Sequence, residues 1–406
     1  MMPLLCYYNI CLILLLLSCC CSGLAIKPST SIITGASGFV GRHIVYQLLQ
    51  QRKVGSDSDD DVIICLVRDN KVKTEQSYWD AHLMDMDESH RCSVKVLPYD
   101  MLDDNGVSLR NALQASPLDY KICVYHTASV FGPTKDPVQT AHDNIKSAEN
   151  VVEAMNDFVS QKQTKGGQKA RLILTSSMAA VRATNQTPLN NKYYTNKDWN
   201  TLSTLDPNNW GSCYQYSKAE SERRAWALAA KYPSLEMLSL CPSFVFGPPP
   251  PLPKRLQSKA GENCSNSYSI ALVDQWLSGK SQVQSRLCVD VRDVALAHVE
   301  AGRMNFDDTT DQRRYILSTE ARLSSELTAD SFRRAVEQYS RETGGSTSID
   351  TTKIECDTHF DGGKIKIGDQ EVECTDLLKR DFGITCRSVD ETFYDMITAM
   401  LAGETF

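Results

Sequence analysis

The sequence lacks the features that would place it among nucleic-acid-binding, metal-binding or repeat proteins. It has no basic stripe and a formal net charge of −7, so it has little means of neutralising the phosphates of a nucleic acid. Its 15 cysteines include no CxxC pair, and no internal repeat or heptad run is present. The chain has 406 residues, of which 42% are hydrophobic, and this is enough for a globular protein with two lobes.

Charge is also absent from the N-terminal segment. No Asp, Glu, Lys or Arg precedes Lys27, and residues 4–26 form one mostly apolar span, long enough to cross a bilayer as a helix. Small residues near its end are typical of a signal-peptide cleavage site, but the usual basic start is missing. We expect residues 1–26 to be a cleaved signal or a retained membrane anchor, which implies the secretory pathway or a membrane. If the leader is an artefact of a misassigned start codon, the chain is cytoplasmic.

Beyond the leader, strand-like and helix-like segments alternate. Apolar runs predict strands at 31–34, at 62–67, and in “VKVLPYD”, “KICVYHTAS” and “ARLILTSS”. Helical periodicity is present at 42–51, 108–115 and 144–158. Fully apolar strands separated by amphipathic helices indicate a parallel sheet covered on both faces. Right-handed crossovers then give a doubly wound α/β fold, which we assign to residues 28–242.

The pattern changes after Pro242. The stretch “GPPPPLPKR” predicts a rigid, extended connection, and the segments that follow it are less regular. We therefore expect residues 243–406 to form a smaller, mixed lobe that binds the substrate. A strand and helix near 286–302 are expected to return to the first domain, whereas 344–373 has no assignment.

Three glycines join the first strand to the first helix in “TGASGFVG”. Gly35 would permit a tight turn, Gly38 would let the backbone approach a ligand, and Gly41 would let the helix pack on the strand. Free N–H groups in the first turn of such a helix attract anions, so a pyrophosphate is the expected guest.

The end of the second strand, “ICLVRDN”, bears on the choice of cofactor. Arg68 has the fork geometry that suits a 2′-phosphate, and Lys71 and Lys73 follow closely. Asp69 could instead hold an unphosphorylated ribose. We expect NADP, with NAD as the alternative.

A Tyr and a Lys four residues apart on a helix can supply a proton to a developing alkoxide. The sequence has two such pairs. Tyr193 and Lys197 lie in an Asn-rich stretch that predicts a loop, whereas Tyr214 and Lys218 lie in a helical segment. The second pair is therefore the candidate. Ser177, at the end of a buried strand, is the expected hydroxyl donor.

The residues around this pair sharpen the assignment. “NWGSCYQYSKAESERRAW”, “DPVQTAHDNIKSAENVVEAM”, “CPSFVFGP” and “DVRDVALAH” follow the glycine turn in order. Together they resemble the extended short-chain dehydrogenases/reductases (the NAD-dependent epimerase/dehydratase family), in particular the dihydroflavonol reductase and cinnamoyl-CoA reductase group. The resemblance covers about residues 31–302 and implies a Rossmann fold.

The resemblance also implies roles for individual residues. Ser177 would polarise the carbonyl, Tyr214 would protonate it, and Lys218 would bind the nicotinamide ribose and lower the Tyr214 pKa. Asn144 would support a proton-relay water. The implied cofactor-binding residues are Gly35, Ser37, Gly38, Phe39, Val40, Gly41, Arg68, Asp100, Met101, Thr127, Ala128, Ser129, Tyr214, Lys218, Pro242 and Val245. No metal site is expected.

We therefore interpret the chain as an NADP-dependent oxidoreductase that reduces a ketone, aldehyde or acyl thioester. The spacing from Trp210 to Tyr214 is longer than in cinnamoyl-CoA reductases, so their substrate is not carried over. A nucleotide-sugar epimerase or dehydratase, a 3β-hydroxysteroid dehydrogenase and a non-catalytic cofactor-binding scaffold are the alternatives. We interpret His126, His298 and Cys213 as structural. The oligomeric state stays open.

Overall fold

The computed structural model describes residues 29–51, 61–86, 92–103, 106–116, 121–162, 170–259, 267–305, 313–344, 347, 349–357 and 368–403. The predicted signal or anchor at 1–26 lies outside these residues. Within them, no helix combines the length and the apolar character that crossing a bilayer requires.

Seven parallel strands form the main sheet, in the order β3-β2-β1-β4-β5-β6-β9. Their bounds are β1 (Ser29–Thr34), β2 (Val62–Val67), β3 (Ser93–Pro98), β4 (Lys121–His126), β5 (Ala170–Thr175), β6 (Leu235–Pro242) and β9 (Arg314–Leu317). The order reverses between β1 and β4, and ligands of open parallel sheets bind beyond the strand ends at such a reversal.

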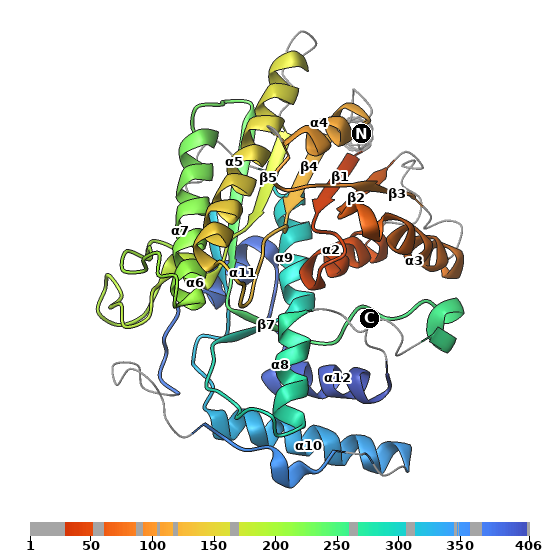
Figure 1. Cartoon of the computed structure of the whole chain (residues 1–406), viewed down its shortest axis with the longest axis vertical. Helices are drawn as coiled ribbons and strands as arrows, with labels where there is room; N and C mark the ends of the chain where they lie inside the picture. The colour runs from red at the N-terminus through yellow and green to blue at the C-terminus, as the bar shows by residue number, and fades with distance from the viewer. Residues whose placement is uncertain are drawn as a thin grey trace, which may run out of the picture.

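Helices cover both faces of this sheet (Figure 1). One face packs against α4 (Val107–Gln114), α5 (Pro137–Lys162) and α7 (Trp210–Ala229). The other packs against α2 (Phe39–Gln50), α3 (Val72–Asp85), α9 (Val291–Arg303) and α11 (Thr375–Phe382). Adjacent strand residues alternate between the two cores, as Ile32 and Ile33 do, because successive side chains of a strand point to opposite faces. The predicted doubly wound fold is confirmed.

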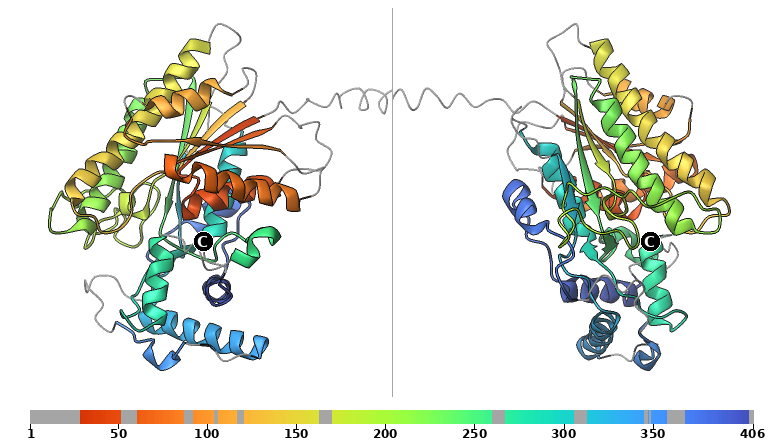
Figure 2. Two further views of the ribbon diagram at one scale, coloured as in Figure 1. Left: turned by 45° about the vertical axis from the view of Figure 1, so that its right-hand side comes forward. Right: turned by 90° about the vertical axis from the view of Figure 1, so that its left-hand side faces the viewer.

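The second lobe lies beyond the carboxyl ends of the strands, at the bottom of both views in Figure 2. It contains α8 (Tyr268–Leu277), α10 (Ser325–Thr343), α12 (Val389–Leu401) and the parallel pair β7 (Phe244–Phe246) and β8 (Cys288–Asp290). Phe246, Trp276, Phe332 and Phe393 form the centre of its own core. Its longest helix, α10, spans 19 residues.

Short helical turns complete the described elements: η1 (Asp69–Lys71), α6 (Met178–Val181), η5 (Lys254–Lys259) and η6 (Thr351–Lys353). The part of the C-terminal half that returns to the first domain is larger than 286–302. Besides α9, which packs on α2, it includes β9 and α11.

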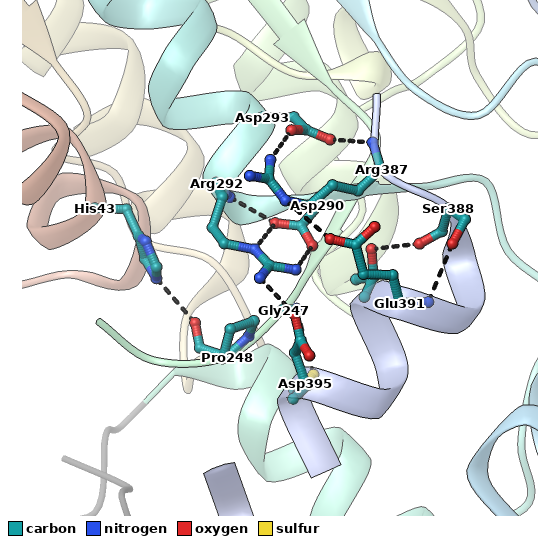
Figure 3. Close-up of polar contacts among 12 residues, drawn as sticks. His43, Gly247, Pro248, Asp290, Arg292, Asp293, Arg387, Ser388, Glu391 and Asp395 are labelled. Atoms are coloured by element: carbon teal, nitrogen blue, oxygen red, sulfur yellow. Dashed lines mark hydrogen bonds and ion pairs between the residues drawn. The ribbon is translucent and has the colours of Figure 1, made fainter. Parts of the chain in front are cut away.

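An ion-pair network at the start of α9 joins the two lobes (Figure 3). Asp290 accepts a hydrogen bond from the Arg292 backbone N–H at 2.7 Å and pairs with the same residue's guanidinium. Arg292 reaches Asp395 on α12 at 2.5 Å, and Asp293 pairs with Arg387. Because α9 also packs on the sheet, these contacts fix the second lobe relative to the strand ends.

Candidate active site

A cavity of about 1180 Å³ lies where the strands of the main sheet end. Segments that follow all seven strands contribute to its wall, together with α7 and parts of the second lobe. Seventeen of the eighteen predicted site residues line it: Gly35, Ser37, Gly38, Phe39, Val40, Gly41, Arg68, Asp100, Met101, Thr127, Ala128, Ser129, Ser177, Tyr214, Lys218, Pro242 and Val245. Asn144 is the exception.

The glycine turn has the geometry that its spacing predicts. Gly35 has a φ of +68°, and a Cβ there would lie 2.9 Å from the Ala128 nitrogen. A Cβ on Gly41 would lie 2.3 Å from the Gly35 carbonyl oxygen, so helix and strand could not pack as closely. No side chain caps the start of α2, which leaves its first N–H groups for a ligand.

Arg68 directly follows β2 and is exposed at the cavity wall. Its neighbour Asp69 also lines the cavity, whereas Lys71 and Lys73 do not. The geometry therefore brings one guanidinium, the group suited to a 2′-phosphate, to the side of the glycine turn where a ribose would lie.

Tyr214 projects from α7 into the cavity, and Ser177 lines the same cavity. Ser177 begins α6 and accepts the Ala179 N–H at 3.1 Å, which fixes its hydroxyl at the end of β5. Burial raises the Tyr214 pKa to about 12, and Ser177 partly offsets the rise. The phenol is therefore protonated at neutral pH and can donate a proton.

Lys218 follows Tyr214 by one helical turn and is buried. Its ammonium donates to the Thr175 carbonyl oxygen at 2.9 Å. Burial lowers the Lys218 pKa to about 8. Burial dominates the Tyr214 pKa in this structure, and the role of Lys218 in lowering that pKa stays a prediction.

Asn144 lies on α5 and faces a smaller cavity that Tyr214 and Trp210 also line. Its side-chain oxygen accepts the Val130 N–H at 2.8 Å, and its amide donates to the Val130 carbonyl at 3.0 Å. The oxygen and the nitrogen of the Asn144 side-chain amide thus both hold the segment after β4 next to the catalytic helix. Its role with a relay water stays a prediction.

Sequence reasoning missed Glu222, a fully buried carboxylate one turn beyond Lys218. Glu222 accepts hydrogen bonds from Ser176 at 2.7 Å and Ser239 at 2.5 Å, and pairs with Arg314 of β9 at 2.7 Å. These contacts fasten α7, and with it Tyr214 and Lys218, to β5, β6 and β9. Since its partners lie far away in the sequence, no local pattern indicates the role of Glu222.

An aromatic wall beside Tyr214 was also missed. The Phe131 ring centre lies 4.8 Å from that of Tyr214, 5.0 Å from Tyr268 and 5.9 Å from Phe244. Trp210, four residues before Tyr214, contacts Phe131 and Tyr268. This part of the cavity suits an apolar or aromatic substrate body.

The residues interpreted as structural have structural contacts. His126 bonds to Thr34 at 2.8 Å, and burial lowers its pKa to about 3. His298 bonds to Thr175 and to the Val294 carbonyl, each at 2.7 Å. Cys213 is buried and donates to the Asp206 carbonyl at 3.0 Å.

The first Tyr-Lys pair, Tyr193 and Lys197, lies in a loop away from the cavity wall. Within the described part of the chain, no cluster of three or more His, Cys, Asp or Glu is placed to hold a metal ion.

The chain is similar to known proteins. The model of the NAD-dependent epimerase/dehydratase family matches residues 31–313. The uncharacterized oxidoreductase C513.07 of Schizosaccharomyces pombe is 30% identical over 283 residues, which are 66% of this chain and 72% of that protein. The NADPH-dependent methylglyoxal reductase GRE2 of Saccharomyces cerevisiae is 26% identical, covering 73% of this chain and 80% of its own.

The solved structure of Candida albicans Gre2 in complex with NADPH has a TM-score of 0.68 at 21% identity and covers 93% of this chain and 100% of that one. This match shows the shared fold. Since the family model spans more than half of the chain and matches its glycine turn, catalytic helix and returning segment, the chain belongs to the NAD-dependent epimerase/dehydratase family, within the extended short-chain dehydrogenases/reductases.

Proposed function

We propose that the chain is an NADPH-dependent reductase that transfers a hydride to the carbonyl carbon of a ketone, aldehyde or acyl thioester. The observation that carries the proposal is that Ser177, Tyr214 and Lys218 line the same cavity as the glycine turn. Relatives named as methylglyoxal reductase and cinnamoyl-CoA reductase support it, because both named substrates contain carbonyl groups.

The residues present fit a phosphorylated dinucleotide. Gly35 and Gly38 line the cavity at the uncapped start of α2, which suits a diphosphate, and Arg68 offers a partner for a 2′-phosphate. When bound, the nicotinamide supplies the hydride. The chain's own groups then have to hold the substrate oxygen and provide a proton.

Three side chains have separate roles in this reaction. The Ser177 hydroxyl donates a hydrogen bond to the carbonyl oxygen, which makes the carbon more electrophilic. The Tyr214 phenol, neutral at physiological pH, gives its proton to that oxygen as negative charge develops. Lys218 is mostly protonated below its pKa of about 8 and offers a cation close to both the phenol and the ribose position.

A nucleotide-sugar epimerase or dehydratase would use the same constellation, and the family name covers such enzymes. The two functions differ in whether the cofactor is consumed in each catalytic cycle. A reductase consumes NADPH in proportion to product, whereas an epimerase regenerates its cofactor in each cycle.

The test is a screen of NADPH consumption with dihydroflavonols, hydroxycinnamoyl thioesters, simple aldehydes and ketosteroids. We expect stoichiometric NADPH oxidation with at least one class. No oxidation with any class, together with epimerisation of a nucleotide sugar, would contradict the proposal.

We also infer that residues 4–26 bring the chain to a membrane, as a cleaved signal or as a retained anchor. The support is the uncharged, apolar character of that segment. Mass spectrometry of the mature N-terminus in its native host separates these outcomes, and an intact N-terminus on protein recovered without membranes would refute the inference.

A further inference from the structure

The wall of the cavity beyond Tyr214 is rich in arginine. Arg182, Arg286 and Arg322 all line it. Two of them share one carboxylate, because Glu371 pairs with Arg182 at 3.2 Å and with Arg322 at 2.9 Å. Glu371 comes from the segment 344–373, which the sequence analysis left unassigned, and it is buried. This wall thus contains three guanidinium charges and one carboxylate charge.

Other acids in the cavity do not balance this excess. Asp69, Asp100 and Asp103 line it too, but they follow β2 and β3, on the far side of the glycine turn from β6 and β7. Among the described residues, the Tyr214 side of the cavity therefore carries a net positive charge.

Of these three arginines, Arg286 is the one for which the described residues supply no carboxylate partner. It lies two residues before β8, the strand that leads to α9, and is partly buried. Its Nε makes no hydrogen bond, although its Nη2 donates to Gln284. Burial lowers the Arg286 pKa, and the nearby charge of Arg322 adds to this. A cation held in this way is destabilised unless a ligand supplies the opposite charge.

The aromatic wall connects Arg286 to the catalytic tyrosine. The Arg286 guanidinium lies over the Phe244 ring, 4.8 Å from its centre. Phe244 contacts Phe131, and Phe131 contacts Tyr214. A ligand that reaches from the Tyr214 hydroxyl to Arg286 would therefore pass Phe131 and Phe244, which line the cavity and favour an apolar, aromatic body between its two polar ends.

We propose that the substrate of this site is an anionic carbonyl compound, with its carbonyl at Tyr214, a flat apolar body along Phe131 and Phe244, and a carboxylate or phosphate group against Arg286. This inference rests on the proposed reductase function and narrows its substrate class. Arg286 is then a specificity residue: it binds the end of the substrate that does not react, by a charge-assisted hydrogen bond.

Matched pairs of aldehydes test the inference. We would compare 4-formylbenzoate with its methyl ester, and the two-ring 4′-formylbiphenyl-4-carboxylate with its methyl ester. To separate phosphate from carboxylate as the anion, 4-formylphenyl phosphate is compared with 4-methoxybenzaldehyde. The readout is the ratio of kcat/KM, anionic over neutral, within each pair.

We expect wild-type protein to favour the anionic member of at least one pair by about tenfold to about a hundredfold, the range of one charge-assisted hydrogen bond. Arg286→Gln should bring this ratio close to one, and Arg286→Lys should keep part of it. Arg334→Gln is the matched control, because Arg334 is exposed on α10 and pairs with Asp390 there. It should leave the ratio as in wild type.

Ratios near one in wild type, or an equal loss for both members in Arg286→Gln, would overturn the inference and leave the reductase function standing. Calorimetric binding of 4-(hydroxymethyl)benzoate and its methyl ester to NADPH-loaded protein gives the same comparison without turnover. Tighter binding of the anion that Arg286→Gln abolishes would support the anion site even if no aldehyde is reduced. Equal binding of acid and ester would refute it.

Discussion

Glu222→Gln removes one negative charge from the protein interior and should destabilise the fold strongly. The Glu222 carboxylate has no exposed surface and accepts hydrogen bonds from Ser176, Ser239 and Arg314. Glutamine has the same shape, so packing is preserved and the charge is what changes. Arg314, which is 7% exposed, would keep its bonds to the backbone carbonyls of Asn196 and Asp198 but lose its ion pair with Glu222.

Leaving one member of a buried ion pair uncompensated costs about 3–5 kcal/mol. We expect the free energy of unfolding, measured by urea titration, to fall by about this amount. Glu149→Gln is the control on the same face of the sheet, because Glu149 pairs with the exposed Arg224 at 3.1 Å. Loss of that surface pair should cost less than about 1 kcal/mol.

The pH dependence gives a second readout. Burial alone would raise the Glu222 pKa, but Arg314 and the hydrogen bonds hold it below its usual value of 4.5. A carboxylate with a lowered pKa stabilises the fold above its unfolded-state pKa and loses that effect as the pH falls through its folded-state pKa. The stability gap between wild type and Glu222→Gln should therefore narrow below pH 4.5. A gap below about 1 kcal/mol at neutral pH, equal to that of the control, would refute the reasoning.

Three further changes probe the cofactor end of the cavity. Gly35→Ala should weaken NADPH binding and destabilise the fold more than Gly383→Ala, which has the same φ of +68° but open space for its Cβ; equal unfolding midpoints would contradict this. The Kd for NADPH, measured by fluorescence, should rise as the pH passes 8, because Lys218 loses its proton there. A Kd that does not change with pH in this range would contradict the role of the Lys218 ammonium in binding. Arg68→Ala should raise the NADPH Kd by about tenfold and leave NADH binding nearly unchanged, whereas equal wild-type affinities for the two would contradict the assignment of Arg68.

Most of the sheet and the catalytic helix could be predicted because their signals are local. The glycine spacing, the apolar strands and the interval from Tyr214 to Lys218 are set by near neighbours in the chain. The helix α3 was missed because its inward side carries polar residues: Glu75 pairs there with Arg42, and His82 is buried with it. This dilutes the apolar periodicity that identifies a helix.

The other omissions are long-range. Glu222 meets Arg314 across 92 residues of sequence, and Glu371 reaches Arg322 across 49. Nothing in the local pattern around these residues indicates a partner, since charged residues on helices and loops are usually solvated. The partner of Lys218 is also long-range: helical spacing places Lys218 near Tyr214 but does not show that its ammonium bonds to the Thr175 carbonyl oxygen.

The central claim is that the Tyr214 phenol supplies the proton for carbonyl reduction. It is tested most directly by Tyr214→Phe, with Tyr193→Phe in the loop as the matched control, in steady-state NADPH oxidation with the best substrate of the screen. The account predicts that kcat falls by about 10² to 10⁴ in Tyr214→Phe, while the NADPH Kd and the activity of Tyr193→Phe stay at the wild-type level. An unchanged kcat in Tyr214→Phe would contradict it.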